Sequence, residues 1–455
     1  MVSRRLSHTL RAMLLRTIAD SVRGGTDMKP NNQERRATWS WAFYDWANSA
    51  YATVVIAGFF PVFFQSFWST GVDPAVATSR LGFANGLSGA IIALSAPFLG
   101  AIADYAGAKR RLLGLFMLLG VLCTAALSFV EAGAWFEAAA LFVLANVGFM
   151  GANVFYDALL VAVSRRKRLD FVSGLGYGMG YLGGGLLFAG AVAATLKPEL
   201  FGLADQAQAV QASFVATAIW WLIFALPLFL WVPEPAPRLT SYRAAVAAGM
   251  KQVAMTLRRI TKMRQVGLFL LAYWLYIDGV HTVITMAVGY GAALGFGTEQ
   301  LISALLLVQF VGFPAAILFG KLGERIGAKR GIFLGLAVYV GVSVWGVFLS
   351  EPWEFFGIAV LVGMVQGGVQ ALSRSYYARL IPEAESGEFF GFYNLLGKFA
   401  TLIGPPLFGL FGLWFGQRYS MLAVIILFVA GGLLLARVRE EKAIGAQFQA
   451  LSDQP

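Results

Sequence analysis

The stretch GAIADYAGAKR, residues 100–110, returns as GKLGERIGAKR at residues 320–330. Both copies have a first glycine, an acid four residues later and a closing Gly-Ala-Lys-Arg. The shared positions are Gly100, Asp104, Gly107, Lys109 and Arg110 in the first copy and Gly320, Glu324, Gly327, Lys329 and Arg330 in the second. A match of this length favours a chain built from two related halves over coincidence.

The composition excludes an ordinary water-soluble protein. Of the 455 residues, 58% are hydrophobic and only 13% are charged, and the mean hydropathy is +0.69. A soluble chain of this length would need more charge on its surface, so the sequence predicts a polytopic membrane protein. The single cysteine, Cys123, excludes an internal disulfide framework and a cysteine metal cluster.

Twelve apolar runs have the roughly 20 residues that a helix needs to cross the hydrocarbon core of a bilayer. They lie near 41–66, 82–104, 112–130, 138–163, 171–194, 212–232, 267–290, 300–320, 331–349, 354–377, 389–412 and 419–437. The polar segment 233–265 divides six runs from six. The predicted fold is therefore an all-α integral membrane protein with twelve transmembrane helices in two pseudo-symmetric six-helix bundles.

This division gives the predicted order of segments: a basic arm at 1–40, a first bundle at 41–232, a linker at 233–265, a second bundle at 266–437 and a tail at 438–455. The arm lacks the apolar core of a secretory signal. A short amphipathic helix on lipid headgroups could be formed there by Leu6, Leu10, Met13 and Leu14. A disordered arm, or a start at Met28, is the alternative interpretation.

Charge is distributed unequally between the two sides of the membrane. When successive runs alternate in direction, 30 of the 35 Lys and Arg residues fall on one side. This imbalance is the positive-inside pattern, so both termini are expected in the cytoplasm. We expect a multi-pass monomer in a bacterial inner (plasma) membrane. The formal charge of +11 then faces anionic lipid, which argues against nucleic-acid binding.

The repeat extends beyond the two loops. WAFYDWANS at 41–49 aligns with WLYIDGVHT at 274–282. This alignment pairs Asp45 with Asp278 and Asn48 with His281. A weaker match aligns 151–174 with 368–391 and pairs Asp157 with Arg374. Six-span halves repeated in parallel place a substrate site between them, near the middle of the bilayer.

The loops at 100–110 and 320–330 resemble the signature loop of the major facilitator superfamily. One branch of this superfamily, the vacuole effluxers, is related to a fungal vacuolar amino-acid exporter. The stretches that resemble this branch are WAFYDWANSAYAT (41–53), NVFYDALL (153–160), SGLGYGMGYLGGG (173–185), GGVQALSRS (367–375) and EFFGFYNLLGKF (388–399). The resemblance covers roughly 40–437. It implies a twelve-helix rocker-switch transporter whose loop acids and bases latch neighbouring helices in one conformation.

Asp45 and Asn48 are three residues apart and share a helix face. A charge at the centre of a membrane costs about 2.5–3.5 kcal/mol on insertion scales, so such residues usually face a partner or a watery cavity. Asp45 lies near the start of its run, where the helix dipole also favours a carboxylate, whereas Asp278 lies well inside its run. We predict that both line the transport pathway, with Asn48 orienting the carboxylate or meeting substrate.

His281 follows Asp278 by three residues, and histidine titrates near physiological pH. The pair could carry a coupling proton, or make a hydrogen bond with no role in transport. It is inadequate as a metal site, because the only other histidine is His8. Lys398, within the eleventh run, could bind a substrate carboxylate or neutralise a neighbouring aspartate.

Asp157 and Arg374 lie toward the cytoplasmic ends of the fourth and tenth runs. In the fold that the resemblance implies, these runs line opposite sides of the cavity. We predict that the two residues pair across the cytoplasmic gate when it is shut and part when it opens. Separate partners for each residue are the alternative.

The sequence thus predicts a secondary active transporter of a small organic solute, with amino acids implied by the resemblance and a proton as the candidate coupling ion. The alternatives are a proton-coupled carrier of sugars or drugs and, from another class, a membrane scaffold or lipid scramblase. No DDxxD, HExxH or GxSxG motif points to an enzyme, and no phosphate-binding loop points to primary transport. We therefore predict no catalytic residue and no cofactor; substrate and lipid bilayer are the expected partners.

Overall fold

The computed structural model describes residues 31–440 except 235, 238–243, 245, 252, 254–262 and 400–402. The amphipathic helix predicted near Leu6, much of the predicted linker and the tail beyond Glu440 lie outside these residues. Among the described residues, eleven helices are long and apolar enough to span a bilayer.

The first group of helices comprises α2 (Asn32–Ala50), α3 (Phe60–Phe63), α4 (Pro74–Ala106), α5 (Lys109–Ala126), α6 (Trp135–Val163), α7 (Leu169–Leu196) and α8 (Gln206–Trp231). The π-helices Tyr51–Phe59 and Phe64–Trp68 flank α3, so one apolar span runs from Asn32 to Trp68. Short 3-10 helices lie in the connections at Leu127–Phe129, Arg166–Arg168 and Pro198–Phe201.

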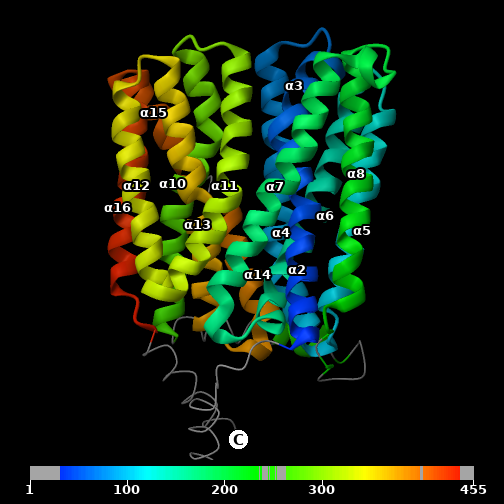
Figure 1. The fold of residues 1–455 in the computed structure, drawn as a ribbon. Helices are drawn as coiled ribbons and strands as arrows, with labels where there is room; N and C mark the ends of the chain where they lie inside the picture. Colours follow the sequence, from blue (N-terminus) through cyan, green and yellow to red (C-terminus); the bar gives the residue numbers. More distant parts are fainter. Residues whose placement is uncertain are drawn as a thin grey trace, which may run out of the picture.

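The second group comprises α10 (Arg264–Ala293), α11 (Thr298–Ile326), α12 (Ala328–Phe348), α13 (Pro352–Leu380), α14 (Ser386–Phe399), α15 (Gly404–Phe415) and α16 (Ser420–Arg437). Short 3-10 helices occur at Glu383–Glu385 and Gln417–Tyr419. The two groups stand side by side, with their helices roughly upright in Figure 1.

The first helix begins at Asn32, before the predicted start at residue 41. The side-chain oxygen of Asn31 accepts the Glu34 N–H at 2.7 Å, and the Asn31 N–H donates to the Glu34 carboxylate at 3.2 Å. This capping box satisfies two N–H groups that have no acceptor inside the helix. A polar first turn therefore extends the apolar span.

The eleventh crossing, predicted at 389–412, is made by two helices. α14 covers its first part, α15 starts at Gly404, and Ile403 before it is not helical. Neither helix is long enough to be counted among the eleven spans. The sequence Gly404-Pro405-Pro406 explains the break, because prolines have no N–H to donate to a preceding turn.

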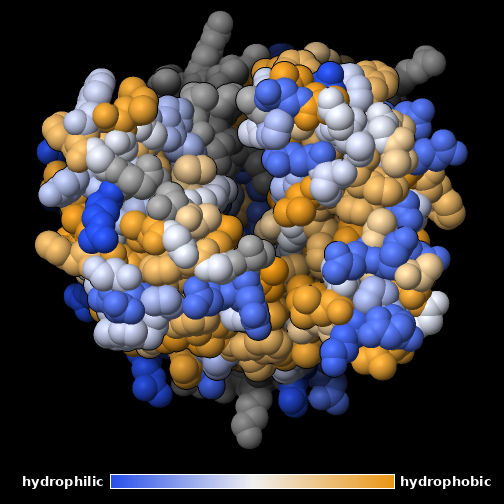
Figure 2. Space-filling view, turned by 90° about the horizontal axis from the view of Figure 1, so that it is seen from above, coloured by the Kyte–Doolittle hydropathy of each residue, from blue (hydrophilic) through white to orange (hydrophobic). Residues whose placement is uncertain are grey.

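The two groups meet where α4 packs against α14 and where α7 packs against α11 and α13. We call the end that carries the α4–α5, α6–α7, α11–α12 and α13–α14 connections the basic end, after its Lys- and Arg-rich loops. Figure 2 views the opposite end, and there the surface is hollowed between the two groups.

Glycines mark the places where the groups touch. A Cβ atom on Gly391 of α14 would lie 2.7 Å from the Ala96 carbonyl oxygen of α4. One on Gly174 of α7 would lie 2.6 Å from the Ala316 carbonyl oxygen of α11. Farther along α4, a Cβ on Gly89 would meet nothing within 4 Å. Along α4 the groups are thus in contact toward the basic end, while a side chain at position 89 would meet no neighbour.

Replacing Gly391 by leucine should disfavour closure of the basic end, because the new side chain collides with the backbone of α4. Overpacking costs about 1–3 kcal/mol, roughly a 5- to 150-fold shift in the ratio of closed to open molecules. A cysteine at buried Ala371, in a Cys123→Ala background, should then react faster with a membrane-impermeant maleimide. Gly89→Leu is the matched control. Equal labelling of both variants would contradict this account of closure.

Candidate functional site

A buried arginine joins the two groups near the basic end. Arg374, in the last turns of α13, is 2% exposed. Its Nε donates to the Ser173 hydroxyl of α7 at 2.9 Å, and its Nη2 donates to the Ser173 carbonyl at 3.0 Å. Its Nη1 donates to Asp157 Oδ1 of α6 at 3.0 Å. These partners belong to the first group, so the side chain of Arg374 crosses between the halves.

Two carboxylates share this guanidinium. Asp45 Oδ2 of α2 lies 3.7 Å from Arg374 Nη2 and accepts the Tyr156 hydroxyl at 2.9 Å. Asp157 also accepts the Asn394 side-chain amide of α14 at 3.0 Å. Asp45 and Asp157 are 9% and 8% exposed. We call Asp45, Asp157 and Arg374 the ionic cluster; with all three groups ionised its net charge is −1.

Aromatic rings enclose the ionic cluster. The Arg374 guanidinium lies 4.4 Å from the ring centre of Tyr177, 4.9 Å from that of Trp41 and 5.4 Å from that of Tyr156. Such cation–π contacts favour a cation removed from water. A Cβ on Gly176 would lie 2.8 Å from Asp45 Oδ2, so the glycine-rich run of α7 leaves room for the carboxylate.

The structure brings Asp157 and Arg374 together, as the repeat alignment predicted for a gate. It also adds Asp45, which the sequence analysis assigned to a separate substrate role. Tyr156 and Ser173 were not predicted as partners, although each lies in a motif that carries the family resemblance. The gating role itself stays a prediction.

A second ion pair between the groups was not predicted from the sequence. Arg379 of α13 donates to Asp170 Oδ2 at the start of α7 at 2.8 Å, and the Ser375 hydroxyl donates to Asp170 Oδ1. Arg166 donates to the Arg379 carbonyl at 2.8 Å. In the sequence, Asp170 is an acid in the first turn of a helix. The helix dipole stabilises a negative charge there, and this position gives no indication of a distant partner.

Two other predicted site residues, Asn48 and His281, make other contacts. Asn48 is 1% exposed and donates to Asn153 Oδ1 of α6, within the first group. His281 is half-buried on α10, and its carbonyl accepts the Thr285 hydroxyl at 2.8 Å. Lys398 belongs to α14, but its side chain lies outside the part of the chain that the structure describes.

Asp278 has different partners from Asp45, to which the repeat relates it. Its carboxylate accepts the main-chain N–H groups of Ile403 and Gly404, at the start of α15, at 3.0–3.1 Å. Asp278 is fully buried on α10. One repeat-related aspartate therefore binds a guanidinium and a hydroxyl, and the other binds backbone.

The first predicted latch loop connects the two groups. Asp104 lies 2.7 Å from Lys109 Nζ and accepts the N–H groups of Gly387 and Glu388, at the start of α14, at 3.0 and 2.9 Å. Lys109 donates to the Ser386 hydroxyl at 2.7 Å. A carboxylate at a helix start is stabilised by free N–H groups and by the helix dipole. Asp104 thus holds α14 from the opposite half.

The second loop reproduces only part of this arrangement. Arg110 donates to two carbonyl oxygens at the end of α8, at 3.0 and 2.7 Å, and Lys329 donates to two at the end of α16, at 2.9 and 2.8 Å. Each base therefore holds the last helix of its own half. Glu324, the counterpart of Asp104, is exposed. Gly107 and Gly327 have φ of +58° and +89°, which favour glycine in both turns.

The first glycine of each loop lies at a contact between the halves. Gly100 of α4 packs against Gly387 of α14. A Cβ on Gly320 of α11 would lie 2.7 Å from the Asp170 carbonyl oxygen of α7. A side chain at either position would push the halves apart. Arg330, the last predicted latch residue, is exposed.

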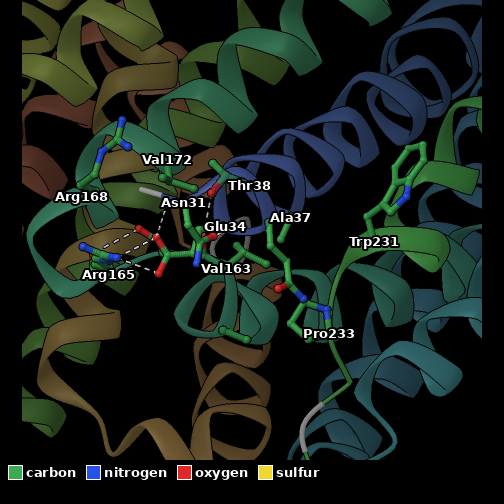
Figure 3. A pocket seen from close by; sticks show the side chains of 13 residues that line it. Asn31, Glu34, Ala37, Thr38, Val163, Arg165, Arg168, Val172, Trp231 and Pro233 are labelled. Carbon is green, nitrogen blue, oxygen red and sulfur yellow. Dashed lines mark hydrogen bonds and ion pairs between the residues drawn. The ribbon is translucent and has the colours of Figure 1, made fainter. Parts of the chain in front are cut away.

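A separate cavity of about 290 Å³ lies at the basic end of the first group. The start of α2, the α6–α7 connection and the end of α8 line it, with Glu34, Arg165 and Trp231 among the side chains (Figure 3). Arg165 Nη2 donates to both Glu34 carboxylate oxygens at 2.8 Å. No predicted substrate or gate residue lines this cavity, so we do not assign it to transport.

Comparison with known proteins finds a family and related transporters. The family model described as vacuole effluxer Atg22 like matches residues 75–447. The chain is 41% identical to the uncharacterized MFS-type transporter YxiO of Bacillus subtilis, over 88% of this chain and 94% of that protein. It is 26% identical to autophagy-related protein 22 of Yarrowia lipolytica, over 56% of this chain and 47% of the fungal protein.

A solved structure has the same fold. The major facilitator superfamily transporter FucP of E. coli, in its outward conformation, superposes with a TM-score of 0.67 at 12% identity, over 89% of this chain and 98% of FucP. At this identity the likeness shows the fold alone. The predicted two-bundle facilitator fold and the vacuole-effluxer resemblance are confirmed. Because the relatives are transporters, the prediction that the chain is not an enzyme is also confirmed.

Replacing Arg374 by glutamine should leave Asp45 and Asp157 as buried carboxylates without their cation. Breaking a buried pair from one side costs about 3–5 kcal/mol, so we expect a lower melting temperature and loss of transport. The double variant Asp157→Asn/Arg374→Gln should recover part of the stability, because one uncompensated charge is gone. Thermal unfolding in detergent measures both effects. Arg325→Gln, at an exposed arginine, is the control; an Arg374→Gln protein as stable as this control would refute the compensation.

Proposed function

Because the chain belongs to the vacuole effluxer Atg22-like family, we propose that it is a secondary active transporter that carries amino acids across the membrane by alternating access. The observation that carries this proposal is the ionic cluster. It lies buried between two halves that touch at the basic end and are hollowed at the other (Figure 2). A carrier that alternates access needs charged partners at such a boundary that separate when one end of the protein opens and the other end closes.

The charges of the cluster suit a zwitterion. An amino acid needs an acceptor for its ammonium group and a donor for its carboxylate. Asp45 is the less firmly held carboxylate of the cluster, because its contact with Arg374 is 3.7 Å, against 3.0 Å for Asp157. We assign the ammonium group to Asp45 and the carboxylate to Arg374 or Lys398. The resemblance noted in the sequence supports the same substrate class by analogy.

Asp157 and Arg374 form the gate in this proposal. Their ion pair links α6 of the first half to α13 of the second, and Asn394 of α14 holds the other Asp157 oxygen. Opening the basic end separates α13 from α6 and α7, so the pair has to part. Asp170 and Arg379 make a second bond across the same boundary and would part with it.

We also propose that transport is coupled to protons. A net charge of −1 buried in the cluster is costly, and a proton on one carboxyl group removes it. Asp45, which has the longer contact with Arg374, is the carboxyl that we assign to the proton while the substrate is absent. The pair Asp278 and His281 is the other candidate from the sequence. The basic end faces the cytoplasm of a bacterium in this proposal, in accordance with the positive-inside rule.

Counterflow in proteoliposomes tests the substrate class. Purified protein is reconstituted with unlabelled solute inside, and uptake of a panel of labelled amino acids and sugars is measured. We expect saturable exchange of neutral amino acids, reduced at least tenfold by Asp45→Asn because the ammonium group loses its charged acceptor.

The matched control is Asp205→Asn, at an exposed aspartate that caps α8. Exchange of a sugar in place of amino acids would keep the carrier and refute the substrate class. No exchange of any solute by folded protein would refute the proposal of amino-acid transport and direct the search to lipids or drugs.

Proton coupling is tested by imposing a pH gradient on the same vesicles. If Asp45 holds the proton, the residual exchange of Asp45→Asn should not respond to the gradient, while His281→Gln should respond as the wild type does. If the Asp278 and His281 pair carries the proton, His281→Gln is the variant that loses the response. A wild type whose uptake ignores the gradient would refute coupling to protons.

A further inference from the structure

The start of α15, at Gly404, falls within the eleventh crossing predicted at 389–412. The first N–H groups of a helix have no acceptor within it. Here the first turn contains Pro405 and Pro406, which have no N–H, and the Leu407 N–H bonds the Ile403 carbonyl at 3.0 Å. The donors that remain are the N–H groups of Ile403 and Gly404. Inside a bilayer each unsatisfied group of this kind is costly.

A single carboxylate satisfies both donors. Asp278 Oδ2 accepts the Ile403 N–H at 3.1 Å, and Gly404 donates to Oδ1 at 3.0 Å and to Oδ2 at 3.1 Å. The Thr282 hydroxyl lies 3.5 Å from Oδ1 and donates to the Asp278 carbonyl at 2.8 Å. Asp278 is 0% exposed. The positive end of the helix dipole of α15 also stabilises this buried negative charge.

Position 404 has room for glycine alone. A Cβ at Gly404 would collide with the Thr282 hydroxyl and with Asp278 Oδ1. Neither atom can move away without breaking the bonds just described. The Gly-Pro-Pro sequence of α15 and the Asp-x-x-x-Thr sequence of α10 therefore fit each other as one contact.

The two helices of the eleventh crossing differ in which halves hold them. The start of α14 is bound by Asp104 of the first half, and α14 packs against α4 and α6 as well as against α10 of its own half. The start of α15 is bound by Asp278 of the second half, and α15 packs against α16 and α10. Each helix start thus has its own aspartate.

We propose that Asp278 is a positioning residue that anchors α15 to α10, so that the eleventh crossing divides into α14, which loses its contacts with the first half when the basic end opens, and α15, which stays anchored within the second half. When the basic end opens, α14 leaves Asp104 and α4. α15 keeps its place against α10, because the bonds to Asp278 lie wholly within the second half. This inference rests on the proposed alternating access, and it gives Asp278 a role other than binding the substrate.

The test combines hydrogen exchange with transport kinetics on the full-length protein. The variants are Asp278→Ala, Asp278→Asn and Gly404→Ala. Asp278→Asn keeps one acceptor oxygen, and Gly404→Ala disrupts the same contact from the α15 side. Gly409→Ala is the matched control, because a Cβ at Gly409 of the same helix would meet nothing within 4 Å. Exchange is read by mass spectrometry on peptides from the start of α15 and from α14.

We expect Asp278→Ala and Gly404→Ala to speed exchange at the start of α15 roughly tenfold or more, since bonds to a charged acceptor are lost. Exchange in α14 should stay unchanged. Asp278→Asn should show a smaller effect, and Gly409→Ala none. In counterflow, kcat should fall while KM stays within about twofold, because the substrate site is intact.

Unchanged exchange at the start of α15 in Asp278→Ala, with a raised KM and an unchanged kcat, would overturn the proposal and make Asp278 a substrate ligand. If Asp278→Ala does not fold, Asp278→Asn and Gly404→Ala decide on the same readouts. The exchange experiment needs no substrate, so it decides the anchoring of α15 even if the amino-acid assignment fails. Fast exchange in α14 and α15 together would also refute the division into two independently held helices.

Discussion

A guanidinium buried within a membrane protein needs fixed partners, and the partners that the structure describes for Arg374 lie across the boundary between the halves. Its helix belongs to the second half, while Asp157, Asp45 and Ser173 belong to the first. Closing the basic end and compensating this charge are therefore one event. In the proposed transport cycle, separating the halves would remove these partners, and water, substrate or another acceptor would have to replace them.

Helix starts impose a second constraint of the same kind. A bilayer offers no water to free N–H groups, so a helix that begins inside the protein needs an acceptor from a neighbour. Asp104 supplies it for α14 and Asp278 for α15, from different halves. Glycines at positions 387 and 404 allow the carboxylates to approach the backbone. In this one crossing, the start of α14 is thus bound by the first half and the start of α15 by the second.

Both copies of the repeated loop bind the last helix of their own half, but they do so through residues that are not aligned with each other. Arg110 and Lys329 each hold the last helix of their own half through its terminal carbonyl groups. Asp104 reaches the other half, whereas Glu324 is exposed, and Asp170 on α7 makes the second connection instead. Arg110 aligns with Arg330 and Lys329 with Lys109, so the bond to the last helix has changed its residue between the copies. The contacts between the bundles also differ between the copies, and in the proposed alternating access these are the contacts that break.

Hydropathy, loop charge and the internal repeat determined the membrane class, the crossings and the two halves from sequence alone, because each is a property of local runs of residues. The repeat also indicated Asp157 and Arg374 as partners. Only the tertiary structure decided that Asp45 joins them, that Asp170 binds Arg379, and that Asp278 binds backbone. The Gly-Pro-Pro signal was visible, but its effect depends on an acceptor more than a hundred residues away. Such pairings follow from how distant helices pack, and no local pattern encodes that.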